Sequence, residues 1–219
     1  MSRINFSPDD LLSTTRSVRK RLDLTRSVPM ETIEECLHLA LQAPTSTYGE
    51  NWRFVVVRDS ETKQGIAKWY RQGHAMFKKR QSGSADNKKS STVARKRLLR
   101  SIDHLAQNLH NVSTLVIPCL MGRLDTKENA GDLTYQSTMY ASIIPAVWNF
   151  MLAARSRSLG TCWTTLHLPY EREVAKILDI PYREIMQVAM IPVAYTLGTE
   201  FKAAPRRPLD QVMCIDRWK

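Results

Sequence analysis

"TLVIPCLM", residues 114–121, is the stretch that says most about the fold, because it is apolar almost from end to end. Two other segments have the same character: "RFVVV", residues 53–57, and "MQVAMIPVAY", residues 186–195. Short continuous apolar runs bounded by polar residues are typical of buried strands. The sequence therefore predicts three strands, and we expect the third to run through the whole of "MQVAMIPVAY".

Helical patterns lie between these strands. Apolar residues recur at helical spacing within residues 29–43, and a second, shorter pattern covers residues 174–178. Residues 135–157 are apolar around most of the helix circumference, which predicts a helix buried between layers or between subunits. Strands separated by helices indicate a layered α/β or α+β domain. A chain of 219 residues fits one domain, residues 1–219, and we see no linker within it.

The formal net charge of +11 is concentrated in one segment. Residues 71–100 contain a single acid, Asp86, and many Lys and Arg residues around the polar stretch "QSGSADNKKSST". That stretch has no aromatic side chain on which a base could stack, so nucleic-acid binding is not favoured. We expect a flexible, solvated basic insert at about residues 71–100, and an anion-binding arm is the alternative.

"TTRSVRK", residues 14–20, groups basic and hydroxyl side chains and admits three interpretations: a solvated helix face, a nucleic-acid patch or a phosphate clamp. The chain has 8 Gly and neither G-x-G-x-x-G nor a P-loop, so side chains would have to hold any phosphate. Arg16 and Arg19 would share one face of a helical turn, with Ser17 between them. "RRPLD", residues 206–210, is a second basic cluster. Alone, either cluster is more typical of exposed arginines.

The spacing of the cysteines and histidines indicates neither a metal site nor a disulfide framework. The four cysteines lie far apart without a C-x-x-C pair, and the five histidines have no ligand spacing. We interpret Cys162 as a small apolar filler and His167 as a structural histidine with satisfied hydrogen bonds. No apolar run has the ~20 residues that a spanning helix needs, so we expect a soluble, cytoplasmic protein without membrane contact.

Four segments, in this order and spacing, resemble the FMN-dependent nitroreductase family, and its actinobacterial NAD(P)H nitroreductases most closely: "TTRSVRKRLD", "ECLHLALQAPTSTYGENWRFVVVRD", "RSRSLGTCWTTLHL" and "VAMIPVAYTLGTEFKAAPRRPLDQV". The similarity runs from about Thr14 to Val212 and breaks down within residues 71–100. It implies an α+β fold with a central, mostly antiparallel sheet flanked by helices. It also implies a homodimer that binds FMN at the subunit interface and passes hydride from NAD(P)H to a nitroaromatic, quinone or related acceptor by a ping-pong route.

By this resemblance, Arg16, Ser17 and Arg19 match the segment that contacts the phosphate, ribityl chain and pyrimidine edge of FMN. Arg206 matches a basic residue that pairs with the phosphate. Pro44, Thr45 and Ser46 match a loop that approaches the flavin from the partner chain. Trp163, Thr164 and Thr165 match a segment that lies against the flavin ring. FMN carries the chemistry, so no catalytic side chain and no metal ligand is implied.

The sequence also departs from the family pattern. Tyr48, Glu50 and Asn51 in "APTSTYGENW" stand where the family has Asn, Gln and Pro, and Thr15 and Ala204 stand where Arg and Lys are common. We expect Tyr48 to shape the acceptor pocket. Two alternatives to the nitroreductase function stay open: a flavin- or nucleotide-binding protein without turnover, and an FMN-dependent tailoring oxidase or dehalogenase-like enzyme.

Overall fold

The apolar segment 114–121 forms β2 (Thr114–Met121), the central strand of a five-stranded sheet. The structure is a computed structural model that describes residues 4–46, 49–83 and 93–218. β1 (Trp52–Val57) pairs with one edge of β2, and β4 (Ile185–Gln187) and β5 (Ile191–Tyr195) pair with the other. β3 (Leu159–Thr161) extends the sheet beyond β5. All four pairings are antiparallel, as the α+β prediction requires.

The third predicted strand is two strands, and this corrects the expectation for residues 186–195. Between the pair Val116↔Ile191 and the pair Cys119↔Gln187, β2 has two residues where the opposite chain has three. One of the two is Pro118, which has no N–H to donate and accepts only, from the Val188 N–H at 2.9 Å. The extra residue forms a bulge-like break at the proline, where the ladder cannot continue.

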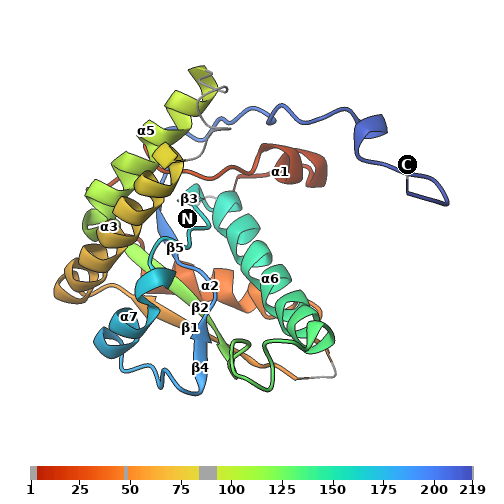
Figure 1. The fold of residues 1–219 in the computed structure, drawn as a ribbon. Helices are drawn as coiled ribbons and strands as arrows, with labels where there is room; N and C mark the ends of the chain where they lie inside the picture. Colours follow the sequence, from red (N-terminus) through yellow and green to blue (C-terminus); the bar gives the residue numbers. More distant parts are fainter. Residues whose placement is uncertain (1–3, 47–48, 84–92, 219) are drawn as a thin grey trace.

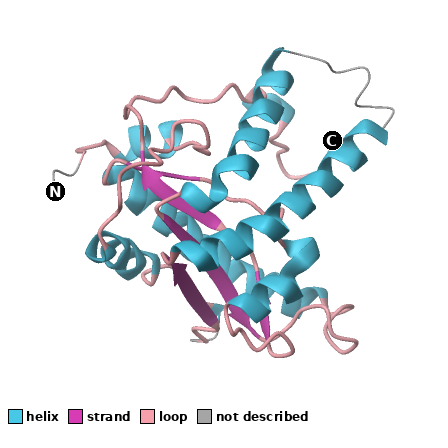
Figure 2. Cartoon of the chain, turned by 90° about the vertical axis from the view of Figure 1, so that its left-hand side faces the viewer, coloured by secondary structure: helices cyan, strands magenta, loops and turns pink. Residues whose placement is uncertain are grey.

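Helices cover both faces of the sheet, which explains why β2 is buried along almost its whole length (Figures 1 and 2). Val116 and Leu120 point into one core with α2 (Met30–Ala40) and α6 (Leu133–Ser156). Leu115 and Ile117 point into a second core on the opposite face. Because successive strand residues face opposite sides, both sets must be apolar, and the sequence shows no polar alternation.

Two of the helices, α1 (Pro8–Thr14) and α6, begin at residues whose side chains cap the first turn. α1 has Pro at its first turn and Ser7 as a cap whose hydroxyl accepts from the Asp10 N–H at 3.1 Å. The Asp132 carboxylate caps α6 by accepting from the Tyr135 N–H at 2.8 Å. The long apolar helix is thus confirmed at Leu133–Ser156, with one face buried against α2 and another exposed.

The predicted basic loop is wrong for most of residues 71–100. α3 (Ser60–Gly83) and α5 (Val93–Asn108) take up all of it except residues 84–92, which lie outside the described residues. The reason is that each helix carries an apolar stripe at helical spacing that packs on the second core. The buried members of the stripes are Ile66, Ala67 and Tyr70 in α3 and Leu105 and Ala106 in α5. Asp103 ties the two helices together by accepting from His74 at 2.9 Å and Lys78 at 3.1 Å.

Short elements complete the fold. They are η2 (Leu109–Asn111), η3 (Leu168–Tyr170), α7 (Glu171–Ile177) and η4 (Leu209–Gln211). Residues 202–218, here called the C-terminal arm, extend away from the body (Figure 1), and none of them is buried. Within the described ranges, no helix is both long and apolar enough to cross a membrane.

Candidate functional site

The "RSVR" segment is extended, which corrects the expectation of a helical turn. α1 ends at Thr14, and Ser17 then forms a parallel bridge with Thr161 at the edge of β3. The Val18 N–H donates to the Thr161 carbonyl at 2.8 Å. Val18 can come this close because its neighbour is Gly160, where an added Cβ would lie 2.9 Å from the Val18 Cβ. The sheet edge, not a helix, therefore fixes the directions of the arginines.

A pocket of about 820 Å³ opens beside this segment. It is lined by four stretches of the chain: residues 15–21, residues of α5, residues of α6, and Phe201 with residues of the C-terminal arm. Six lining side chains are positively charged and none is acidic; the six are Arg16, Arg19, Lys20, Arg21, Arg97 and Arg206. The structure thus brings together both basic clusters that the sequence placed near opposite ends of the chain.

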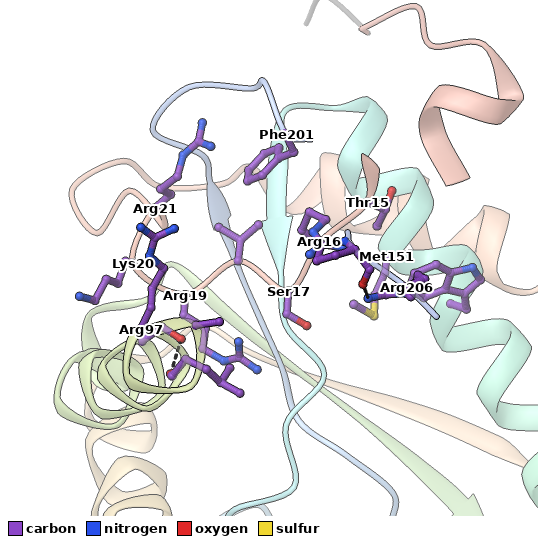
Figure 3. A pocket seen from close by; sticks show the side chains of 16 residues that line it. Thr15, Arg16, Ser17, Arg19, Lys20, Arg21, Arg97, Met151, Phe201 and Arg206 are labelled. Atoms are coloured by element: carbon purple, nitrogen blue, oxygen red, sulfur yellow. Dashed lines mark hydrogen bonds between the residues drawn. The ribbon is translucent and has the colours of Figure 1, made fainter. Parts of the chain in front are cut away.

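Figure 3 shows how the cations are distributed around the pocket. Arg19 and Arg97 lie on the α5 side, Arg16 and Arg206 lie on the α6 side near Met151, and Ser17 lies between the two groups. An anion in this pocket would meet guanidinium groups from more than one direction, and each guanidinium can donate two parallel hydrogen bonds to a phosphate.

Arg21 has a different task from the other cations. Its Nε and Nη1 donate to the carbonyls of Leu197 at 2.8 Å and Glu200 at 2.9 Å, and its guanidinium lies 4.2 Å from the centre of the Phe201 ring. Arg21 therefore fixes the root of the C-terminal arm, which in turn carries Arg206 to the pocket.

The side chains of Arg16, Lys20 and Arg97 form no hydrogen bond or ion pair with another residue in the described part of the chain. Among the described residues, the Arg206 side chain donates only to the carbonyl of its neighbour Pro205, at 3.3 Å. Ser17 is exposed, so its hydroxyl is open to the pocket. The guanidinium groups of Arg16 and Arg97 at the pocket therefore keep hydrogen-bond donors that a ligand could use.

Sequence reasoning missed four further lining residues that matter for the shape of the pocket. Arg97 and Ser101 come from α5, and Trp148 and Met151 come from α6. Within α5, the lining positions 94, 97, 98 and 101 follow helical spacing, so the signal was present in a segment that we predicted to be a loop.

Residues 163–165 lie outside this pocket. Thr164 is buried, shares a hydrogen bond of 2.8 Å with the Tyr70 hydroxyl, and bridges to Met190. Trp163 packs against the core of α2 and α6, and Thr165 is exposed. The segment crosses α3 closely, because an added Cβ at Gly73 would lie 1.6 Å from the Leu166 carbonyl oxygen.

Residues 44–46 also lie outside the pocket of their own chain. They follow α2, and the Ser46 N–H donates to the Ser142 hydroxyl of α6 at 3.0 Å. Pro44 is exposed, and Thr45 is half-buried. Tyr48, which we expect to shape the acceptor pocket, lies outside the described residues.

Two buried side chains that the sequence analysis interpreted, Cys162 and His167, lie outside the lining of this pocket. Burial raises the pKa of the Cys162 thiol, which fits an inert apolar neighbour. His167 has no exposed surface, neither ring nitrogen has a partner among the described residues, and burial lowers its pKa from 6.5 to about 3. The expectation that its hydrogen bonds are satisfied was wrong.

Arg155 contacts the ring of Phe201, which lines the pocket. It is 4% exposed, and its guanidinium lies 4.7 Å from the centre of the Phe201 ring and 4.5 Å from that of Phe6. Its Nε and Nη1 have no hydrogen-bond partner in the described chain, and burial, with Arg21 nearby, lowers its pKa. Its charge adds to the positive potential of this region.

The chain belongs to the nitroreductase family, whose model matches residues 12–195. This match supports an oxidoreductase function. The sheet and its flanking helices are those of the nitroreductase fold, and the pocket formed by residues 15–21 lies mostly within the matched range. The narrower likeness to actinobacterial members stays a prediction.

Solved structures share the fold across nearly the whole chain. A BluB-like flavoprotein from Clostridium difficile 630 is 17% identical, with a TM-score of 0.71 over 97% of this chain and 100% of that one. Oxidised iodotyrosine deiodinase bound to FMN and 3-iodo-L-tyrosine is 21% identical, with a TM-score of 0.68 over 96% and 97%. A nitroreductase-like family protein from Bacillus cereus is 17% identical, with a TM-score of 0.67 over 96% of each chain.

Proposed function

We propose that this nitroreductase-family protein is an FMN-dependent oxidoreductase that holds the flavin phosphate in the pocket beside residues 15–21. The observation that carries the proposal is the lining of that pocket, where six cations and no acid gather and several donors have no partner in the described chain. Positively charged donors of this kind fit a phosphate monoester, so the residues present suit FMN.

The clamp consists of Arg16 and Arg206 with the Ser17 hydroxyl between the basic groups. Charge-assisted hydrogen bonds contribute about 1.5 to 3 kcal/mol each, and three or four of them are comparable with the ~8 kcal/mol of a micromolar complex. We assign Arg19 to the pyrimidine edge, where a cation stabilises the negative charge that a reduced flavin carries.

When bound, FMN would supply two-electron redox chemistry between NAD(P)H and a nitroaromatic, quinone or related acceptor. The protein contributes binding and orientation. Arg16, Ser17 and Arg206 hold the phosphate end, which fixes the position of the ring at the other end. No side chain has to transfer a proton in this scheme, in keeping with a pocket without an acidic lining residue.

A homodimer belongs to the proposal. α6 exposes Tyr140, Ile144 and Trp148, each four residues from the next, with exposed fractions of 37%, 44% and 41%. The C-terminal arm also exposes large apolar side chains, among them Leu209, Val212, Ile215 and Trp218. A second copy would cover such surface, and residues 44–46, held against α6 by Ser142, would then approach the partner's flavin.

The test is purification followed by anaerobic titration. We expect the protein to carry noncovalent FMN, identified by mass spectrometry after release, and NADH or NADPH to bleach the flavin absorbance. Absence of flavin, or FAD in its place, would contradict the cofactor assignment. Flavin that neither nucleotide bleaches would mean a binding protein without this turnover.

A further inference from the structure

The pocket holds more positive charge than the proposed flavin phosphate needs, and this inference rests on the proposed function. A phosphate monoester carries about −1.5 to −2 charges at neutral pH, whereas six cations line the pocket. Arg16 and Arg206 suffice for that phosphate, and Arg21 is engaged by the carbonyls of Leu197 and Glu200. Arg19 is assigned to the pyrimidine edge of the flavin. Lys20 and Arg97 are then the two pocket cations to which no part of FMN is assigned.

Arg97 is placed on the pocket by the geometry of α5. The residues of this helix that line the pocket are Ala94, Arg97, Leu98 and Ser101, one stripe at helical spacing. Arg97 is the cation of that stripe, and Figure 3 shows it extending from α5 toward the segment of Lys20 and Arg21. Ser101 donates its hydroxyl proton to the Leu98 carbonyl at 2.7 Å, so recognition of an anion there falls to the cations.

Other basic residues of α5 differ in this respect. Arg100 is exposed and lines none of the described pockets, and Lys96 faces the groove between α3 and α5 instead. Asp103, the acid of this helix, is paired with His74 and Lys78 and does not line the pocket. The charge of Arg97 is thus neither neutralised by an acid of its own helix nor directed at the α3 groove.

We propose that Arg97, with Lys20, binds a second anionic group: the phosphate or carboxylate of a reactant that meets the flavin. A guanidinium matches either group through two parallel hydrogen bonds. The group has two sources. One source is the reductant, whose anionic group would be the 2′-phosphate of NADPH. The other source is the acceptor, whose anionic group would be the carboxylate or phosphate of an acidic aromatic compound.

The test compares Arg97→Gln with Arg100→Gln, which removes the same charge from the same helix outside the pocket. FMN-loaded protein is titrated with 2′,5′-ADP and with 4-nitrobenzoate, followed by flavin absorbance and by the fluorescence of the tryptophans, since Trp148 lines the pocket. Arg97→Gln should weaken binding of at least one of these anions about tenfold, the loss expected for one charge-assisted hydrogen bond. Arg100→Gln should bind both as wild type does.

Turnover then identifies the source of the anion. If it is the reductant, the ratio of kcat/KM for NADPH to that for NADH falls about tenfold in Arg97→Gln. If the source is the acceptor, the ratio of kcat/KM for 4-nitrobenzoate to kcat/KM for 4-nitrobenzamide falls about tenfold instead.

The proposal is overturned if Arg97→Gln and Arg100→Gln bind both anions equally. It is also overturned if Arg97→Gln purifies without FMN, because Arg97 would then belong to the flavin clamp. The flavin content of the wild-type protein judges the proposed function separately.

Discussion

Arginine is used in opposite ways in two regions of this molecule. Arg123, after β2, is 8% exposed and fully engaged: it pairs with Asp125 at 2.8 Å and with Glu171 at 2.9 Å, and its Nη1 donates to the Tyr182 and Ile185 carbonyls. Arg16 and Arg97 line an open pocket and have no such partner in the described chain. The difference is in the surroundings, because the side chain is the same.

The comparison teaches how to separate structural cations from binding cations. A buried charge without a partner is strongly destabilising, and the ion pairs and hydrogen bonds of Arg123 meet this requirement. Arg155 is the exception, because it is buried against the rings of Phe6 and Phe201 while its Nε and Nη1 have no hydrogen-bond partner in the described chain. An arginine at a pocket can stay solvated until an anion arrives, so it can be left without a partner at little expense in stability. Whether an arginine forms hydrogen bonds within the chain therefore indicates whether it stabilises the fold or binds a ligand, which its charge alone does not.

The largest effect should come from the Arg123 region. Arg123→Met leaves Glu171 and Asp125 without their cation and two carbonyls without a donor, so the free energy of unfolding should fall by about 3–5 kcal/mol. Urea denaturation measures it. Arg97→Gln is the matched control from the pocket and should change stability by less than about 0.5 kcal/mol. Equal losses in the two variants would erase the comparison.

The converse variant is Arg206→Ala, which should spare stability and weaken FMN binding by about 2–3 kcal/mol through the lost charge-assisted hydrogen bonds. Flavin retention on dialysis and a titration of the flavin-free protein measure it. Arg207→Ala, the adjacent exposed arginine, lines no described pocket and serves as control. Retention of FMN equal to wild type would remove Arg206 from the clamp.

His167 extends the comparison, because it is buried, its ring nitrogens have no hydrogen-bond partner among the described residues, and it lines none of the described pockets. Its pKa is lowered in the folded protein from 6.5 to about 3, so below pH 6.5 the unfolded chain binds a proton that the folded chain does not. The free energy of unfolding should therefore fall with decreasing pH, by up to about 1.4 kcal/mol per pH unit from this residue, across the window from about 6.5 to 3.

The measurement for His167 is urea denaturation at several pH values between 7 and 4. His167→Met should show the shallower dependence on pH, while His38→Met, at an exposed site on α2, should keep the wild-type slope. Identical slopes in wild type and His167→Met would show that this imidazole is not kept neutral by burial.

The smallest expected effect is a twofold difference in FMN content and activity. It tests whether the flavin site is built from both chains of a dimer. Arg206→Ala damages the clamp, and Ser46→Trp blocks the segment expected to approach the partner's flavin; each homodimer should be nearly inactive. A doubly tagged mixed dimer has one intact site and should recover about half of the wild-type FMN and activity. No recovery in a folded mixed dimer would mean that each site is built within one chain.

β1, β2, the segment that forms β4 and β5, and the helix at 133–156 could be predicted because their apolar patterns are local. The short strand β3 was not predicted. The helices of residues 71–83 and 93–100 could not be predicted, since we gave more weight to the polar stretch between them than to the apolar spacing of positions such as Ile102 and Leu105. Arg97 was missed for the same reason. The extended form of "RSVR" depends on pairing with Thr161, and the break at Pro118 depends on which strand lies opposite; neither partner is visible in the local sequence.

The root of the C-terminal arm also matters for genetics. Phe201 is fixed against the body by Arg21, whereas no residue from 202 to 218 is buried. A premature stop codon just after Phe201 would therefore leave the sheet and both cores intact, and the product would pass a solubility or folding screen. Yet it would lack Arg206, so such an allele should behave as a loss of cofactor and not as a loss of protein.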